Sequence, residues 1–203
     1  MKKKLILFVT TAFLTITTTL QAQQEERCFK TGTSAINLGV GFGNTVTYGT
    51  GLYGYGGAVS IAPAFTASYE YGIIHVGIGI IGAGLEFGYQ GSHYNYTDGV
   101  NIYKERWTTL GFCPRATYHF DILNKGKFDI YPIIQLNVYS SIYTDNGPAG
   151  NVYVNPNNSS VFIRPSILAA VRYYFTPNFG VYSELGYDIS IIKAGISLKF
   201  GGN

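Results

Sequence analysis

The sequence contains few charged residues and few of the residue types that build metal or redox centres. Only 12% of its 203 residues are charged, and it has two cysteines, three histidines and one tryptophan. The cysteines form no CxxC motif, and the different contexts of Cys28 and Cys113 leave their pairing open. His75, His93 and His119 show neither HxxxH nor HExxH spacing. The sequence therefore predicts no metal site and no cofactor.

Motifs of common enzyme classes are also missing. No GxSxG nucleophile elbow occurs. The pattern GxGxxG occurs at Gly49–Gly54 and at Gly77–Gly82, but no helical pattern follows either stretch to supply a helix N-terminus for a pyrophosphate. Glycines in the second stretch are better explained by crowding and bending within a strand. The sequence predicts no catalytic residue.

Long apolar runs are absent except at the N-terminus. Lys2 to Lys4 form a charged region, Leu5 to Leu20 an apolar and Thr-rich region, and Leu20-Gln21-Ala22 an acceptable cleavage site. The apolar region is shorter than the ~20 residues that a membrane-spanning helix needs, so a single anchor is the weaker interpretation. Residues 1–22 are therefore predicted to be a secretory signal peptide. Cys28 does not directly follow the cleavage site, which argues against a lipoprotein anchor.

An excess of basic charge is missing from the rest of the chain. The formal net charge is +3, but removal of residues 1–22 takes away three of 14 basic residues and leaves 11 against 11 acidic ones. No basic patch remains, so nucleic acid is not a predicted partner. The remaining residues suffice for one domain. We expect a polar periplasmic lead-in over residues 23–33 and the folded domain over residues 34–203.

The chain is rich in glycine and aromatic residues, and its apolar residues alternate with polar ones. It contains 26 glycines, and 16% of its residues are aromatic. The last such stretch, Ile191 to Phe200, has Ile192, Ala194, Ile196, Leu198 and Phe200 on one face. Lys193, Gly195, Ser197 and Lys199 share the other face, which is the period of a strand between two unlike media.

Eight stretches alternate in this way and predict eight strands. Between Ile80 and Ile81 the apolar parity switches, which predicts a β-bulge there. The predicted strands span residues 35–43, 61–71, 74–89, 103–120, 128–143, 161–173, 179–188 and 191–200.

The predicted connections alternate in length. Short turns are expected at Gly72, at Asp121–Lys127 and at Thr176–Asn178, whereas Asn44–Ser60 and Thr144–Ser160 are long and rich in Gly, Asn and Tyr. Short turns at one end and long loops at the other are typical of an outer-membrane barrel, with periplasmic turns and external loops.

Within the regular regions of these strands, charged residues occur on only one parity. A charge facing lipid at the membrane centre costs ~2–4 kcal/mol for Arg or Lys, so the charge-free parity is predicted to face lipid. The charged parity then faces the lumen, where we expect a plugging network centred on Glu184 with Arg172 and Lys193 as partners. Its predicted members are Glu70, Glu86, Arg115, Asp129, Arg164, Arg172, Glu184, Asp188, Lys193 and Lys199.

Aromatic residues cluster on the apolar parity where the strands meet the short turns. Aromatic side chains favour the headgroup region of a membrane, although aromatic residues are also common in strands generally. We interpret these residues as an interfacial girdle: Tyr69, Tyr71, Tyr118, Phe120, Phe128, Tyr173, Phe175, Phe179 and Phe200.

The chain resembles the small eight-stranded outer-membrane barrels of the OmpA/OmpX type and the broader outer-membrane β-barrel domain family. The most specific motif is the last strand, where Lys193, Gly195, Leu198 and Phe200 match the assembly signal that the barrel-insertion machinery reads. Gly201-Gly202-Asn203 follow the aromatic residue, which is the final residue in many family members. The resemblance implies bacterial outer-membrane localisation, with outer-membrane lipid and the insertion machinery as partners.

The predicted fold class is all-β, an eight-stranded antiparallel up-and-down transmembrane β-barrel. The predicted function is non-enzymatic: envelope structure, or recognition of an unknown surface or periplasmic partner through the loops. Alternatives are a narrow pore or an enzyme that modifies envelope lipids, since some barrels of this size attack lipids with a His and a nearby Ser. His119 on the luminal parity and His75 near a turn are poorly placed for that chemistry.

Overall fold

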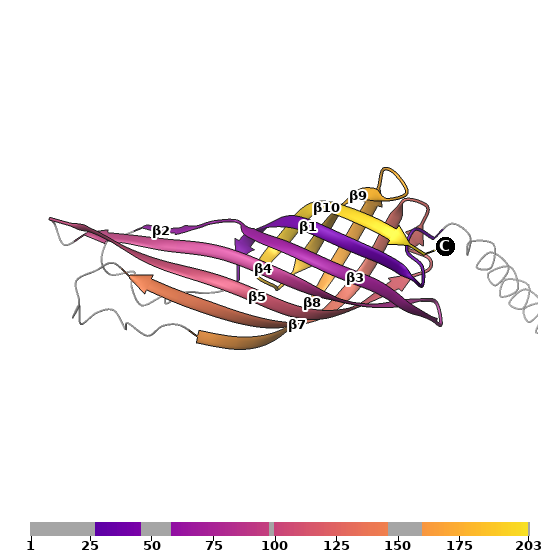
Figure 1. Cartoon of the computed structure of the whole chain (residues 1–203), viewed down its shortest axis with the longest axis horizontal. Coiled ribbons are helices and arrows are strands. Elements are labelled where there is room, and N and C mark those ends of the chain that lie inside the picture. Colours follow the sequence, from indigo (N-terminus) through magenta and orange to yellow (C-terminus); the bar gives the residue numbers. More distant parts are fainter. Residues whose placement is uncertain (1–26, 46–57, 98–99, 146–159, 203) are drawn as a thin grey trace, which may run out of the picture.

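The computed structural model describes residues 27–45, 58–97, 100–145 and 160–202, so the predicted signal peptide lies outside the described residues. These ranges contain no helix long and apolar enough to cross a membrane. They form ten strands (Figure 1): β1 Thr33–Asn44, β2 Ala58–Ile61, β3 Ala64–Val76, β4 Gly79–Thr97, β5 Ile102–Phe120, β6 Asn124–Lys125, β7 Phe128–Asp145, β8 Ser160–Tyr174, β9 Phe179–Gly186 and β10 Ser190–Gly201.

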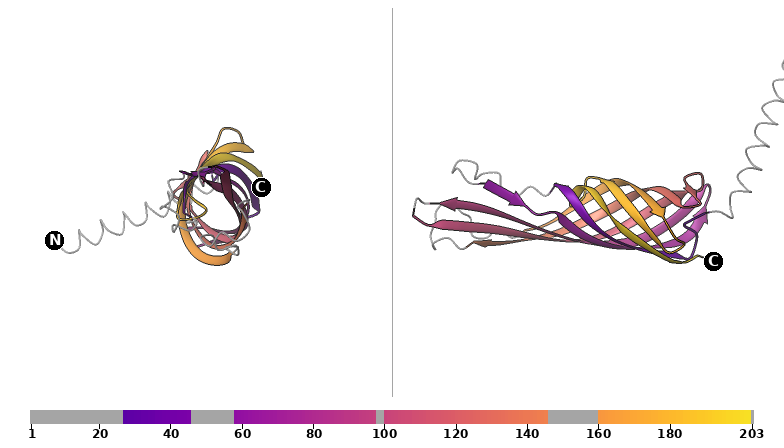
Figure 2. Two further views of the ribbon diagram at one scale, coloured as in Figure 1. Left: turned by 90° about the vertical axis from the view of Figure 1, so that its left-hand side faces the viewer. Right: turned by 90° about the horizontal axis from the view of Figure 1, so that it is seen from above.

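Eight of these strands close into a barrel. Hydrogen-bonded neighbours run in the order β4-β3-β1-β10-β9-β8-β7-β5, and pairing of β4 with β5 closes the ring. Every pairing is antiparallel, and Figure 2 shows the barrel along its axis and from above. Short β2 pairs only with β4, and two-residue β6 pairs with β7 inside a turn. The predicted fold class, and with it the resemblance to the small eight-stranded outer-membrane barrels, is confirmed.

Both ends of the barrel chain lie at the same rim. Thr33 at the start of β1 pairs with Gly201 at the end of β10. The short turns β3–β4, β5–β7 and β8–β9 lie at this rim, which we call the turn side (Figure 1). The opposite end, where β4, β5 and β7 extend furthest, is called the loop side.

The wall has an apolar outer face and a polar inner face. In β3 every second residue from Ala64 to Gly72 is buried, and the intervening ones are exposed. The exposed set is apolar, with Phe65 55%, Phe87 56% and Ile134 65% exposed. A soluble barrel would turn its apolar residues inward. The outer face is therefore that of a barrel that spans a membrane.

The height of the apolar surface matches a bilayer. On β5, outward residues remain apolar from Phe120 to Leu110, and the next outward residue is Thr108. Ten residue steps of ~3.3 Å, at the ~40° tilt usual in such barrels, give a height of about 25 Å. That is the height of the apolar band of an outer-membrane barrel.

The predicted hairpin turn at Gly72 and the predicted bulge at Ile80–Ile81 are wrong. The chain turns at Gly77–Ile78, where Gly77 has φ of +63°, and the register shift lies between Gly72 and Ile74. The parity switch in the sequence therefore reflects this bulge and the turn that follows it. Gly72 belongs to the wall, and its carbonyl accepts a hydrogen bond from Gly32 N at 2.8 Å.

The predicted single strand 61–71 is also interrupted. Ala62-Pro63 separates β2 from β3, and proline has no N–H to donate to a sheet ladder. Because of this break, β2 extends β3 only as a short strand along the loop-side part of β4.

Two paired glycines on neighbouring strands, which we call the small-residue crossing, make room for a large luminal side chain. Gly39 on β1 pairs with Gly195 on β10, and the buried Tyr182 of β9 lies over them. A Cβ on Gly39 would lie 2.1 Å from Tyr182 Oη, which is far inside van der Waals contact. Gly39 is thus required by the packing of the lumen.

Gly39→Ala is expected to lower the free energy of unfolding by about 1–3 kcal/mol, because the added methyl overpacks the crossing. The measurement is the urea midpoint of the protein folded into lipid vesicles. Gly91→Ala is the control, since its Cβ would meet no atom closer than Tyr89 Oη at 3.6 Å. An unchanged midpoint for Gly39→Ala would contradict the packing described.

Candidate functional site

The lumen holds two groups of ionised side chains. The loop-side cluster consists of Glu86, Arg115, Glu184, Asp188 and Lys193. Arg115 donates to Glu86 at 2.7 Å and to Glu184 at 2.9 Å. Lys193 Nζ lies 2.8 Å from Glu86, 2.7 Å from Glu184 and 2.5 Å from Asp188. All five side chains are buried, so each charge is compensated by its neighbours rather than by water.

The turn-side cluster consists of Glu70, His119, Asp129 and Arg172. Arg172 donates to Glu70, and its Nη1 lies 3.5 Å from Asp129. The two ring nitrogens of His119 face different carboxylates, Nε2 at 2.5 Å from Glu70 and Nδ1 at 2.9 Å from Asp129. A neutral imidazole can donate from only one nitrogen, so this arrangement requires the imidazolium form. The cluster then contains two positive and two negative charges.

Uncharged side chains pack against both clusters and between them. Gln135 accepts from Arg115 Nε at 2.9 Å and donates to Asp188 at 3.0 Å. The Tyr131 ring lies 4.5 Å from the Arg172 guanidinium carbon, and Tyr139 donates to Asp188 at 2.5 Å. Tyr131 packs with Ile133, Leu168 and Ala170 in a buried apolar group. These side chains lie within the lumen, and a plugged lumen remains a prediction.

The residues before β1 fold into the turn-side end of the lumen. Phe29 is fully buried and stacks on His119 at 4.0 Å between ring centroids. The Asn124 side chain accepts from the backbone N–H of Cys28 and of Phe29, each at 3.0 Å. Burial raises the pKa of the Cys28 thiol to about 12, so it is held protonated and unreactive. This segment therefore closes the turn-side end.

Most of the predicted network residues are buried together, but the pairing differs from the expectation. Glu184 binds Lys193 as expected, but its second partner is Arg115, while Arg172 binds Glu70 and Asp129. Ala170 is the cross-strand partner of Glu184, and Arg172 lies two residues nearer the turn side than Ala170. Each ion-pair partner is determined by which strands face each other across the lumen. The register between neighbouring strands does not give this.

Two predicted members lie at the ends of the lumen. Arg164 donates to Thr45 Oγ1 at 2.9 Å and to the Asp188 carbonyl at 2.7 Å, and its guanidinium lies 4.2 Å from the Tyr187 ring centroid. Lys199 donates to the Cys28 carbonyl at 2.5 Å at the turn side. His119 was missing from the predicted set although its parity is luminal, and parity alone would have found it.

The terminal-strand residues divide between the two faces. Lys193 is buried in the loop-side cluster, and Gly195 lies at the small-residue crossing with Gly39. Leu198 and Phe200 face outward, 36% and 42% exposed. Their role in assembly remains a prediction, and the geometry leaves both side chains accessible to another protein or to lipid.

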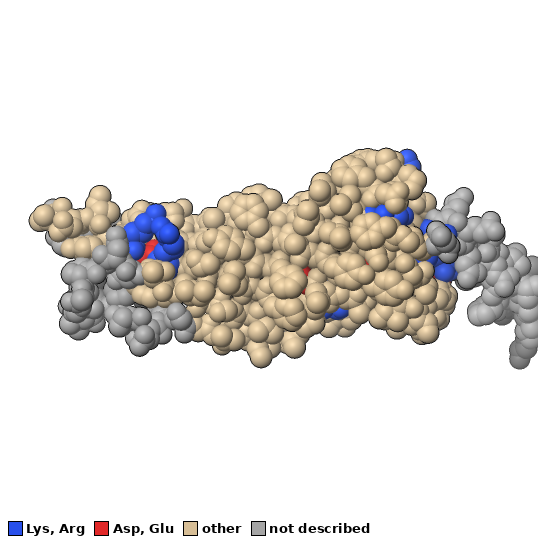
Figure 3. Space-filling model, viewed as in Figure 1, with Lys and Arg blue, Asp and Glu red and all other residues tan. Residues whose placement is uncertain are grey.

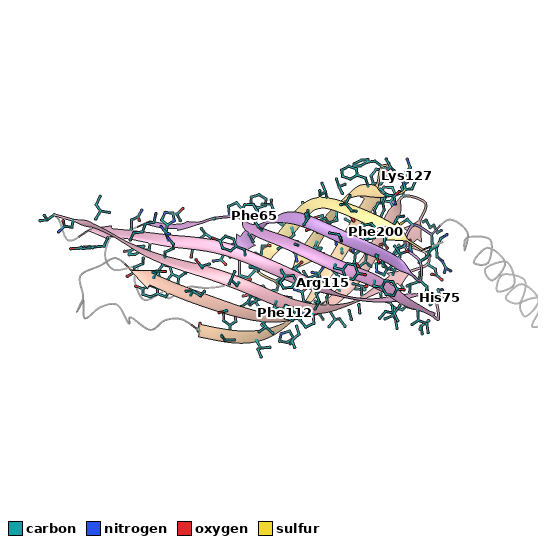
Figure 4. All side chains as sticks on the ribbon, viewed as in Figure 1. Phe65, His75, Phe112, Arg115, Lys127 and Phe200 are labelled. Atoms are coloured by element: carbon teal, nitrogen blue, oxygen red, sulfur yellow. The ribbon has the colours of Figure 1, made fainter. Side chains whose placement is uncertain are left out.

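The predicted girdle residues face outward in the turn-side halves of their strands or in the turns themselves, and Figure 4 labels Phe200 among them. Several touch one another, with 4.7 Å between the ring centroids of Phe128 and Tyr173 and 5.2 Å between those of Tyr173 and Phe175. Sequence analysis missed a second set toward the loop side. Its exposed outward members, recognisable by parity, are Phe42, Phe65, Phe87, Tyr89 and Phe112.

The described part of the lumen contains no metal-binding group and no exposed thiol. In the described part of the chain, no group of three or more His, Cys, Asp or Glu side chains is arranged to hold a metal ion. Cys28 and Cys113 are both buried and free. His119, the histidine with two carboxylate neighbours, is fully buried, so a substrate cannot reach it. The arrangement can hold charge inside the wall and exclude water.

Glu184→Gln is expected to lower the free energy of unfolding by about 3–5 kcal/mol, because Arg115 and Lys193 each lose a charged partner in a buried site. Urea unfolding from lipid vesicles measures the effect. Lys125→Gln, an exposed change in the turn, is the control and should leave the midpoint unchanged. Equal midpoints for the two variants would show that Glu184 is hydrated.

Comparisons with known proteins found structural likeness only. No protein-family model and no curated protein sequence matches the chain. The fold is similar to two crystal structures of Ail, the attachment invasion locus protein of Yersinia pestis, one of them in complex with the heparin analogue sucrose octasulfate. The TM-scores are 0.44 for the complex and 0.39 for the other structure, each at 10% identity over 84% of this chain and 99% of the Ail chain.

Proposed function

We propose that this protein is a non-enzymatic integral barrel of the bacterial outer membrane, with a plugged polar lumen. Its role is envelope structure or recognition of a partner through the loop side. The observation that carries the proposal is the contrast between the two faces. About 25 Å of apolar surface covers the outside, whereas the five carboxylates of the two clusters and their cations are buried inside.

The lumen supports a structural role more than transport. Arg172, Tyr131, Tyr139 and Lys193 are among the largest fully buried side chains, and all four point into the space that a pore would need. Opening a path would require breaking several buried ion pairs, each removal costing about 3–5 kcal/mol. A permanent aqueous channel is therefore disfavoured.

The loop side supports a recognition role. Strands β4 and β5 each have 19 residues and remain paired as far as Thr97 and Ile102, well beyond the apolar band. Trp107 packs on Tyr143 at 5.4 Å between ring centroids, which stiffens this extension. A rigid sheet that projects from the membrane is suited to presenting loops to a surface partner.

The terminal strand contains the residues that we expect the barrel-insertion machinery to recognise. Leu198 and Phe200 are outward and exposed, so the barrel-insertion machinery could contact them before lipid covers them. Outer-membrane lipid is then the permanent partner of the apolar band.

The orientation is tested by labelling intact cells with a membrane-impermeant maleimide. In a background with Cys28→Ser and Cys113→Ser, Val100→Cys on the loop side is expected to react and Lys127→Cys on the turn side is not. Both wild-type positions are exposed, so the difference reports only the side of the membrane. Reaction of Lys127→Cys alone would show the opposite orientation. Recovery of the protein in the cytosolic fraction, with neither cysteine labelled on intact cells, would contradict the membrane assignment. Turnover of lipid A or phospholipid by the purified barrel would contradict the non-enzymatic role.

A further inference from the structure

An apolar groove crosses the outer face of β3, β4, β5 and β7. Its volume is about 600 Å³. The side chains that form its walls include Phe65, Phe87, Tyr89, Leu110 and Phe112, all exposed on the outer face. Figure 4 shows Phe65 and Phe112 away from the turn-side residues His75, Lys127 and Phe200. The groove therefore lies in the loop-side half of the apolar band.

Two nitrogen-bearing side chains lie on the same face just beyond the groove. Arg106 of β5 and His93 of β4 are directly opposite each other in the sheet. Tyr89 and Leu110, which line the groove, form a pair on the same two strands. The row between the two pairs is Gly91 with Thr108, where the apolar surface ends.

Arg106 is available to a ligand. It is exposed, and within the residues that the structure describes no ion pair or hydrogen bond of its side chain is found. The neighbouring acid Glu105 points inward and is fully buried. Lys104 lies two residues further on the same face as Arg106. Figure 3 shows a group of Lys or Arg atoms toward the loop side, separated from those near the turn side by mostly uncharged surface.

The spacing of these features fits one lipid molecule. Arg106 is four residue steps beyond Leu110, the last apolar residue of the band, which at ~3.3 Å per residue and ~40° tilt places its backbone about 10 Å outside the apolar band. The headgroup layer on each side of a bilayer is roughly 5–8 Å thick. The side chains of Arg106 and His93 can reach back toward a phosphate at the outer edge of that layer, and both donate hydrogen bonds to phosphate oxygens.

We propose that the groove and the Arg106–His93 pair form one binding site for a phosphorylated glycolipid of the outer leaflet. An acyl chain lies along the groove, and a sugar phosphate is bound by the pair. This inference rests on the proposed function, because external loops place the groove in the outer leaflet. A lipid is favoured over a protein because the groove lies inside the apolar band, while the adjacent charge requires an anionic headgroup.

The site is tested by native mass spectrometry of the folded full-length barrel in micelles, with bisphosphorylated lipid A as the probe and phosphatidylglycerol as the competing anionic lipid. Lipid A is expected to bind at least tenfold more tightly than phosphatidylglycerol. Arg106→Gln combined with His93→Gln should weaken lipid A binding at least tenfold, and Ala67→Trp, which fills the groove, should do the same.

Matched controls make the same kinds of change elsewhere on the barrel. Lys127→Gln removes an exposed cation at the turn side, and Ala83→Trp adds a large side chain to the outer face outside the groove. Both should bind lipid A within twofold of the unchanged protein. A heat-dependent shift in gel mobility first establishes that each variant is folded.

Three results would overturn the site. Equal affinity for lipid A and phosphatidylglycerol would show only a general attraction of anionic lipid. Unchanged lipid A binding by the Arg106–His93 double variant would show that this pair does not contact the phosphate. Unchanged lipid A binding by Ala67→Trp would show that no acyl chain lies in the groove. None of these results affects the proposed function, which fails separately if the chain does not insert into outer membranes.

Discussion

Charged side chains sealed inside a narrow barrel must be compensated locally, because water cannot reach them. Eight strands enclose a space just wide enough for side chains. Here that space contains Glu70, Glu86, Asp129, Glu184 and Asp188, and Arg115, Arg172, Lys193 and an imidazolium at His119 lie among them. The remaining negative charge is at the loop side, where Arg164 donates to the Asp188 backbone. Charged side chains from seven of the eight barrel strands therefore meet in the lumen.

The outer face follows from the same division of residues. Since alternate side chains point to opposite faces, each charge placed in the lumen leaves its strand neighbours facing lipid. Tyr131 and Asp129 point inward while Ile130 is 41% exposed outside. The bilayer then explains why aromatic residues lie at both edges of the apolar band, with Phe128 at the turn side and Tyr89 at the loop side. The proposed recognition surface begins where this band ends.

Alternation predicted the strands and the face of nearly every charged residue, because the side-chain period of a strand is a local property. It could not predict contacts across the lumen, so Arg115 as the partner of Glu184 was missed. It also misplaced the first hairpin, because Gly72 looks like a turn residue. In the structure its lack of a side chain serves packing, since a Cβ there would lie 2.4 Å from the Lys30 carbonyl. Folding of Phe29 into the lumen has no signal in the periodicity.

A closed, ion-paired lumen is tested most directly by electrical recording from single folded barrels in planar bilayers. Insertion is established independently by the heat-dependent gel shift of protein recovered from the same vesicles. The predicted result is no steady current at moderate voltage, because Arg172, Lys193 and their carboxylate partners fill the path. Steady, ohmic channels from each inserted barrel would contradict a plugged lumen and show that these charges are hydrated.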